Sequence, residues 1–271
     1  MKNIHKALYI CLAILSSSII GCEEVVDPDN LISKGNKLVV NSIISPQLDF
    51  IEVEVSRSEP VLGTHSFELD DLVTDATVTI SDGTNESELV YDFGFDKYRL
   101  SANSFPIVAG KTYSLSVVDQ NDKVTASCTV PQGVEESSAT DEYGNAGYTL
   151  KIQWNGVPNM TNYFHIIYRY SIESAFSSSY DLEEFKKDKS EETSILSVSL
   201  YAESERSSQP RQVDLSILSA DENYYEYQKQ LFSFDFNEGP FSEPVSLHSN
   251  IKGGLGLFGA YNQIDVNYEL N

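Results

Sequence analysis

Cysteine is scarce in this 271-residue chain, and its scarcity excludes a fold held together by disulfides. Cys11 and Cys22 lie in or beside the N-terminal apolar segment, which leaves Cys128 alone in the body of the protein. A single thiol cannot form an internal bridge, so the domains must be held by their hydrophobic cores. Cys128 alternates in phase with Val124 and Val130, and we expect it to be an inert core residue.

Positive charge is also scarce: 18 lysines and arginines face 41 aspartates and glutamates, for a net charge of −23. Nucleic acids and anionic lipid surfaces are bound largely through Lys and Arg. We therefore expect no nucleic-acid partner. The excess of carboxylates favours solubility and suits a basic or cationic partner.

Only one apolar run is long enough to suggest a targeting segment. Ala7–Ile20 follows Lys2 and Lys6 and ends at Gly21-Cys22, the pattern of a secretory signal peptide over residues 1–21. The run is shorter and richer in serine than the about 20 apolar residues of a membrane-spanning helix.

The sequence "IIGC" at the end of this run resembles the lipobox of bacterial lipoproteins, in which the cysteine becomes the acylated first residue. The resemblance implies a lipid on Cys22 and therefore a membrane as a partner. Several acyl chains together hold a protein firmly in a bilayer. Polar residues 22–36, with Pro28 and Gly35, then predict a flexible tether.

Residues 37–133 alternate apolar and polar side chains, which is typical of antiparallel strands with one buried face. "FIEVEVSR" places Ile51, Val53 and Val55 on one face, and turn sequences such as "SDGTNES" separate the strands. This spacing predicts an immunoglobulin-like β-sandwich. Its expected strands are 37–44, 50–57, 76–81, 87–92, 97–101, 111–118 and 123–130.

Residues 134–271 predict a second β-rich domain with one helix. After a predicted linker, Pro131–Gly147, two alternating segments resemble the start of a fibronectin type III-like sandwich. Residues 171–192 are predicted to be a long loop with a turn of helix at Asp181–Lys187. The inward-facing residues of the two segments are Leu150, Ile152 and Trp154, then Phe164, Ile166, Tyr168 and Tyr170.

A helix near 219–233 interrupts these strands. Ser219 and Glu222 have the spacing of a capping box. Tyr224, Tyr225 and Tyr227 cannot all face inward from one helix, so we single them out as a candidate partner or ligand surface, for a glycan or a peptide. The alternative is that the three rings simply cover the sheet.

The glycine-rich segment "GLGLFG" at residues 254–259 fits the dinucleotide pattern G-x-G-x-x-G, but it lacks that motif's context. The motif should open a helix and place an acidic residue about 20 positions later, and the chain ends first. We expect no nucleotide and no other cofactor. Gly253, Gly254, Gly256 and Gly259 are instead predicted to form a structural bend before the last strand.

No catalytic set or metal site emerges from the sequence. There is no G-x-S-x-G elbow, and His165 and His248 are expected on the polar faces of strands without a partner. No His or Cys spacing fits zinc. No EF-hand loop is present for calcium, and acidic turns such as "DQNDK" leave calcium as a minor alternative. Three acidic clusters leave paired carboxylates of a glycosidase open as an alternative: Glu68/Asp70/Asp71, Asp181/Glu183/Glu184 and Glu191/Glu192.

The order of "KLVVNSII", "VEVSRSEP", "DATVTISDG", "ENYYEYQKQL" and "PFSEPVSLHSNIKGGLGLFGAY" resembles the domain-of-unknown-function 4249 lipoproteins of Bacteroidota. The resemblance implies an outer-membrane lipoprotein encoded beside a TonB-dependent transporter. Glu23-Glu24 is similar to signals that send such lipoproteins to the cell surface.

Three hypotheses for function remain. The first is a non-catalytic binding or accessory module on the outer membrane that works with a TonB-dependent transporter in nutrient uptake. The second is a structural or adhesive envelope lipoprotein, and the third is a glycan hydrolase.

Overall fold

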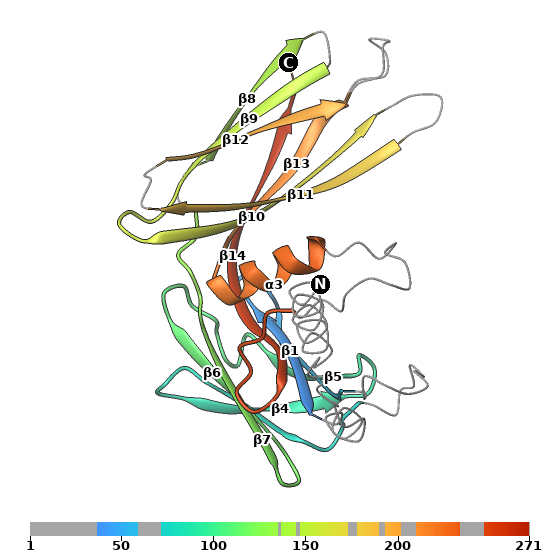
Figure 1. Cartoon of the computed structure of the whole chain (residues 1–271), viewed down its shortest axis with the longest axis vertical. Coiled ribbons are helices and arrows are strands. Elements are labelled where there is room, and N and C mark those ends of the chain that lie inside the picture. The colour runs from blue at the N-terminus through green and yellow to red at the C-terminus, as the bar shows by residue number, and fades with distance from the viewer. Residues whose placement is uncertain are drawn as a thin grey trace, which may run out of the picture. The chain divides into compact units, whose positions relative to one another are not determined.

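The computed structural model describes residues 37–58, 72–134, 137–144, 147–172, 178–189, 193–201, 210–233 and 247–270. This part of the chain is mainly β, with fourteen strands and one helix (Figure 1). The predicted signal peptide, Cys22 and the predicted tether lie outside the described residues.

The first seven strands confirm the sequence prediction to within one residue at each end. Alternating burial along them shows why: Ile51, Val53 and Val55 are buried, whereas Glu52 and Glu54 between them are only half-buried. The strands are β1 (Leu38–Ile44), β2 (Phe50–Arg57), β3 (Thr77–Ser81), β4 (Glu86–Asp92), β5 (Lys97–Ser101), β6 (Thr112–Asp119) and β7 (Asp122–Thr129).

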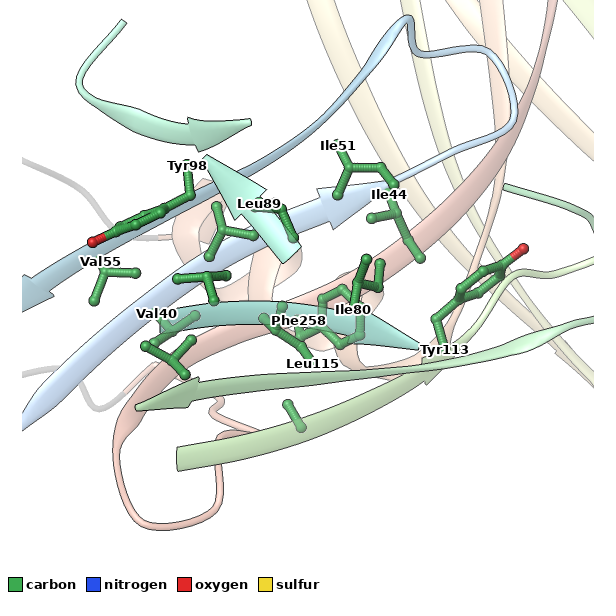
Figure 2. Packing of buried hydrophobic residues seen from close by; sticks show 14 of the residues in the cluster. Val40, Ile44, Ile51, Val55, Ile80, Leu89, Tyr98, Tyr113, Leu115 and Phe258 are labelled. Carbon is green, nitrogen blue, oxygen red and sulfur yellow. The ribbon is translucent and has the colours of Figure 1, made fainter. Parts of the chain in front are cut away.

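These strands form the first sandwich, in the order β1-β2-β5-β4-β3-β6-β7. The sheet curls back on itself, because Thr125 of β7 and Lys252 exchange two backbone hydrogen bonds of 3.2 and 2.8 Å. The enclosed core contains aliphatic side chains and two tyrosines, Tyr98 and Tyr113 (Figure 2). Cys128 belongs to this core, and burial raises the pKa of its thiol well above the ordinary value.

Both core tyrosines satisfy their hydroxyl groups inside the protein. The backbone N–H of Ala76 donates to Tyr98 Oη at 2.7 Å, and this hydroxyl donates to the carbonyl of Val73 at 3.0 Å. Val108 N–H donates to Tyr113 Oη at 2.8 Å in the same way. Both tyrosine hydroxyl groups therefore have partners, as buried polar groups usually do, whereas the buried Oγ of Ser42 in β1 has none among the described residues.

The second sandwich packs two sheets around a separate core. One sheet has the order β12 (Thr193–Tyr201), β9 (Gly147–Asn155) and β8 (Ser137–Gly144). The other has β11 (Ser178–Lys189), β10 (Thr161–Ile172), β13 (Pro210–Ala220) and β14 (Leu255–Glu269). The predicted inward-facing residues are confirmed: Leu150, Ile152, Trp154, Phe164, Ile166, Tyr168 and Tyr170 are all buried in this core.

Two segment predictions in this sandwich were wrong. The predicted linker Pro131–Gly147 contains β8, and the predicted loop 171–192 contains β11, which has no turn of helix at Asp181–Lys187. β11 is an edge strand that pairs with β10 over its whole length. Its charged residues suit an edge, where pairing with other chains must be avoided, and they conceal the strand from a hydrophobicity pattern.

Strand β14 belongs to both sandwiches. Its first part pairs in parallel with β1, from Val39↔Leu255 to Ile44↔Ala260, and its second part pairs antiparallel with β13 (Figure 1). Phe258 lies in the first core. The domain assignment of 134–271 is therefore corrected: residues 255–260 complete the first sandwich.

Amide side chains support β14 where its partner changes. Gln47, in the β1–β2 loop, donates from Nε2 to Asn262 Oδ1 at 2.9 Å and accepts from the backbone N–H of Gln263 at 3.2 Å. Asn262 Nδ2 donates to the carbonyl of Pro131, just after the last strand of the first sandwich, at 3.2 Å. These bonds fix β14 at the position where its pairing with β1 ends and its pairing with β13 begins.

Two glycines allow β14 to approach its neighbours closely. Gly256 has φ +106°, and a Cβ there would lie 2.2 Å from the carbonyl oxygen of Val40. A Cβ on Gly259 would lie 2.9 Å from Cβ of Tyr224 in helix α3 (Glu222–Ser233). Only Gly253 and Gly254 form the expected bend, since Gly256 and Gly259 lie within the strand.

We expect Gly256→Ala to lower the free energy of unfolding by at least about 2 kcal/mol, because the new methyl group meets backbone atoms at a φ that only glycine adopts easily. Urea unfolding followed by tryptophan fluorescence measures the change. Gly94→Ala is the matched control: its Cβ would meet only the flexible side chain of Asp92, at 3.2 Å. Equal stability of the two variants would contradict this account of β14.

Candidate functional site

Helix α3 buries two of its three candidate tyrosines. Tyr224 and Tyr225 are buried against the outer face of β10 and β14, and Tyr227 is half-buried on another side of the helix. Successive residues of a helix are about 100° apart, so two neighbouring rings can share a wide buried face. The expectation of a three-tyrosine surface was therefore wrong for Tyr224 and Tyr225. The ligand role of Tyr227 stays a prediction.

The N-cap of the helix is Asp221 and not Ser219. Asp221 Oδ1 accepts the backbone N–H of Tyr224 at 2.9 Å and also that of Ala260 in β14 at 3.0 Å. Ser219 lies in β13, so the predicted capping box was wrong by two positions. One carboxylate thus starts the helix and ties it to β14, and burial raises its pKa from the ordinary value.

A buried polar network lies beneath the helix. His165 is nearly inaccessible, with Nδ1 3.0 Å from Tyr224 Oη and Nε2 3.0 Å from Glu183 Oε2. The ring of Phe185 stacks on the imidazole at 4.4 Å between centroids. Burial lowers the pKa of His165, and the charge and hydrogen bond of Glu183 oppose this effect. The prediction of a surface histidine was wrong, because α3 covers this otherwise polar face of β10.

Tyr227 lines a hollow of about 340 Å³, which we call the α3 hollow. Its walls come from four strands and the helix, so residues far apart in the sequence meet there. Side chains of both charges and an aromatic ring face the same space. The lining residues are Asn41, Ser42, Ile43, Glu52, Glu54, Lys97, Tyr227 and Leu257.

Ion pairs organise one side of the α3 hollow. Glu52 of β2 is paired with Arg99 of β5, whose Nε donates to Glu52 Oε1 at 2.9 Å. Arg99 also donates from Nη1 to Asp92 at 3.2 Å, and Lys97 Nζ lies 3.6 Å from Glu52. Two cations and two carboxylates therefore compensate one another beside the hollow.

The β4–β5 hairpin next to these ion pairs exposes large apolar side chains. Val90 is 73% exposed, Phe93 78% and Phe95 59%. The guanidinium of Arg99 lies between two rings, 4.0 Å from the centroid of Phe50 and 3.9 Å from that of Phe95. We call the surface of Phe50, Val90, Phe93, Phe95 and Arg99 the aromatic hairpin.

A second hollow of about 330 Å³ lies on the outer face of β3, β6 and β7. Hydroxyl groups line it, together with Lys123, Lys252 and Glu86. It contains no aromatic ring. The α3 hollow therefore combines a wider range of chemical groups, with a ring, apolar side chains and carboxylates in one place.

The remaining candidate residues lie only partly within the described ranges. Glu183 and Glu184 are successive residues of β11 and point to opposite faces, so they are not a carboxylate pair. His248 lies outside any strand, contrary to the prediction, with Nε2 3.0 Å from Asn223 Oδ1. Glu68/Asp70/Asp71 and Glu191/Glu192 lie outside the described residues.

Two negative findings concern the described part of the chain alone. It holds no group of three or more His, Cys, Asp or Glu side chains placed to ligate one metal ion. Its single helix, α3, is too short and too polar to span a bilayer.

Tyr227 was among the candidate residues predicted from the sequence, but the other residues that line the α3 hollow were not. Glu52 and Glu54 were recognised only as the polar face of a strand, which is what their alternation shows. Nothing local connects them to a helix about 170 residues later. The one available signal was that "DFGFDKY" places two phenylalanines in a turn, where apolar side chains are rarely buried.

These features define the described chain as a two-sandwich β protein with surface hollows. The model of the family described as domain of unknown function (DUF4249) matches residues 23–265. The chain therefore belongs to the DUF4249 family, as the resemblance predicted. No curated protein matches the chain.

Among solved structures, the crystal structure of the selenomethionine-substituted chicken interferon gamma receptor alpha chain is similar to this protein. The match covers 69% of this chain and 89% of that chain, with 8% sequence identity and a TM-score of 0.20. A TM-score this low does not establish a shared fold. The fold rests on the strand pairing described above.

We expect Asp221→Ala to lower the free energy of unfolding by about 1–2 kcal/mol, because two backbone N–H groups lose their acceptor. Asp221→Asn keeps the accepting oxygen and removes a charge that burial disfavours. We therefore expect its stability at pH 7 to lie much closer to that of the wild type. Urea unfolding of the three proteins measures both effects, and equal losses for Ala and Asn would contradict the capping role.

The lowered pKa of His165 predicts a loss of stability in acid. Below about pH 6.5 the unfolded chain binds a proton on this imidazole, and the folded chain binds it only at lower pH. The stability that the neutral imidazole contributes to the folded chain is therefore present above pH 6.5, and it is lost as the pH falls through the folded-state pKa. His165→Gln cannot titrate, so urea unfolding between pH 7.5 and 5 should show a steeper decline for the wild type than for the variant. Parallel declines would show that Glu183 cancels the effect of burial.

Proposed function

We propose that this protein is an outer-membrane lipoprotein, anchored through a lipid on Cys22, that acts as a non-catalytic binding module beside a TonB-dependent transporter. The aromatic hairpin is the observation that carries the binding role. Monomeric proteins seldom leave large apolar side chains gathered in the open, and such patches mark sites of protein contact. Phe93 and Val90 of this patch are the most exposed large apolar side chains among the described residues, at 78% and 73%.

The composition of the aromatic hairpin supports a protein partner. Aromatic residues and arginine are enriched where proteins bind one another, and they supply most of the binding energy. Arg99 is held in place by Glu52 and Asp92 and by the two rings that flank it. A side chain ordered before binding loses less conformational entropy when the partner arrives.

The transporter is proposed from family membership together with the family resemblance noted in the sequence. The resemblance implies lipoproteins encoded beside TonB-dependent transporters, with Glu23-Glu24 as a signal for the cell surface. The lipobox at Cys22 supports the anchor. We propose nutrient uptake as the shared process, with the lipoprotein binding and the transporter carrying the cargo.

A structural envelope role is the second candidate, and one observation favours it. β14 pairs with strands of both sandwiches, so a continuous backbone joins the two cores. Such a joint suits a spacer that holds a partner at a set distance from the membrane. The exposed Phe93 and Phe95 have no role in a passive spacer, which is why we place the binding module first.

The test is co-purification of the intact lipoprotein from detergent-solubilised membranes of its own host. We expect a β-barrel transporter in the eluate of the wild type and about tenfold less with the double variant Phe93→Ser/Phe95→Ser. Phe232→Ser is the matched control, because Phe232 is also 59% exposed but lies on α3. A reproducible absence of any β-barrel partner would contradict the proposed binding role.

The anchor is tested separately in the same host. Cys22→Ser should abolish labelling with a radioactive fatty acid and release the protein from the membrane fraction. A variant that stays in the membrane would show that the lipid on Cys22 is not the anchor.

A further inference from the structure

One carboxylate in the α3 hollow has no counter-charge. Glu52 and Asp92 are compensated by Lys97 and Arg99, as described above. The side chain of Glu54, two residues along β2, makes no ion pair or hydrogen bond with any residue that the structure describes. The hollow therefore has a net negative charge, located at Glu54.

Tyr227 lines the same hollow as this carboxylate. Its side chain is half-buried, and its hydroxyl has no hydrogen bond to any described residue. Burial and then the nearby charge of Glu54 raise the pKa of the Tyr227 phenol above its ordinary value. A carboxylate without a counter-charge and an aromatic side chain thus line the same space.

Two of the remaining lining residues are apolar, beside the polar side chains of Asn41 and Ser42 and the charged Glu52 and Lys97. Ile43 is half-buried and Leu257 is buried, and both line the space between β1, β14 and α3. The backbone N–H of Leu257 is already satisfied by Asn41 Oδ1 at 3.2 Å. A ligand here needs one charged end for Glu54 and Tyr227 and a short aliphatic part for Ile43 and Leu257.

We propose that the α3 hollow binds a monovalent organic cation, a guanidinium or ammonium group on a short aliphatic stem, between the carboxylate of Glu54 and the ring of Tyr227. Carboxylates form charge-assisted hydrogen bonds with both groups, and aromatic faces attract both. A volume of about 340 Å³ is at the small end of ligand pockets. The net charge of −23 raises the local concentration of cations.

This inference goes beyond the proposed function, because the hollow and its charge do not depend on a transporter. Two sources share the chemistry: a free small amine or guanidine, and the side chain of lysine or arginine in a peptide. Calorimetric titration of the full mature chain in detergent separates them. The probes are butylguanidinium, butylammonium, the neutral analogue butylurea and the peptide Gly-Arg-Gly amide.

We expect both butyl cations to bind at least about tenfold more tightly than butylurea, because only their hydrogen bonds to Glu54 are strengthened by a positive charge. Tighter binding of the peptide than of butylguanidinium would support the proposal with a peptide as the source. Exclusion of the peptide while the butyl cations bind would support it with a small amine as the source. Butylurea binding as tightly as the cations, or no binding of any cation, would overturn the proposal.

Variants of Glu54 and Tyr227 provide a second test of the proposed site. Glu54→Gln should weaken butylguanidinium about tenfold, and Tyr227→Leu about two- to fivefold, with Tyr227→Phe close to the wild type because the ring remains. Glu88→Gln is the matched control: it removes the same charge from an exposed site on β4. Unchanged binding by Glu54→Gln, with its thermal midpoint also unchanged, would overturn the site even if butylguanidinium binds elsewhere.

Discussion

The backbone pairing of β14 is the interaction on which the rest of the structure depends. The strand adds to β1 in parallel and then to β13 antiparallel, so each sandwich needs it to complete a sheet. The parallel part is possible only because Gly256 has no Cβ to meet the carbonyl of Val40. Unsatisfied backbone groups are costly in a core, so losing this strand would expose both sheets. Two sandwiches that look separate in sequence therefore share one element.

Helix α3 takes its position from the same strand. Asp221 links the start of the helix to Ala260, and Gly259 lets Tyr224 pack directly on the strand. The helix then covers His165 on one side and leaves Tyr227 at the rim of the α3 hollow. Both the buried network and the candidate ligand site therefore exist because β14 brings a helix of the second sandwich beside the strands of the first.

Much of the first sandwich was predictable, because each of its strands alternates strongly between apolar and polar residues. β8 and β11 were missed for the opposite reason: "SSATDEYG" and "SSYDLEEFKKDK" read as polar loops. Their strand conformation comes from pairing with β9 and β10, which supply every hydrogen bond on one side. His165 was misplaced because alternation shows which face of a strand is polar, and only the packing of α3 decides that this face is covered.

The sequence by itself determined the mainly β class, the seven strands of the first sandwich, the inward-facing residues of the second and the strong acidity. These properties are local or compositional, since period-two alternation and charge need no knowledge of distant partners. The tertiary structure decided that β14 serves both sandwiches, that Tyr224 and Tyr225 are buried, and that Glu54 and Tyr227 line one hollow. Each of these depends on contacts between residues far apart in the chain, which only the closed fold brings within reach.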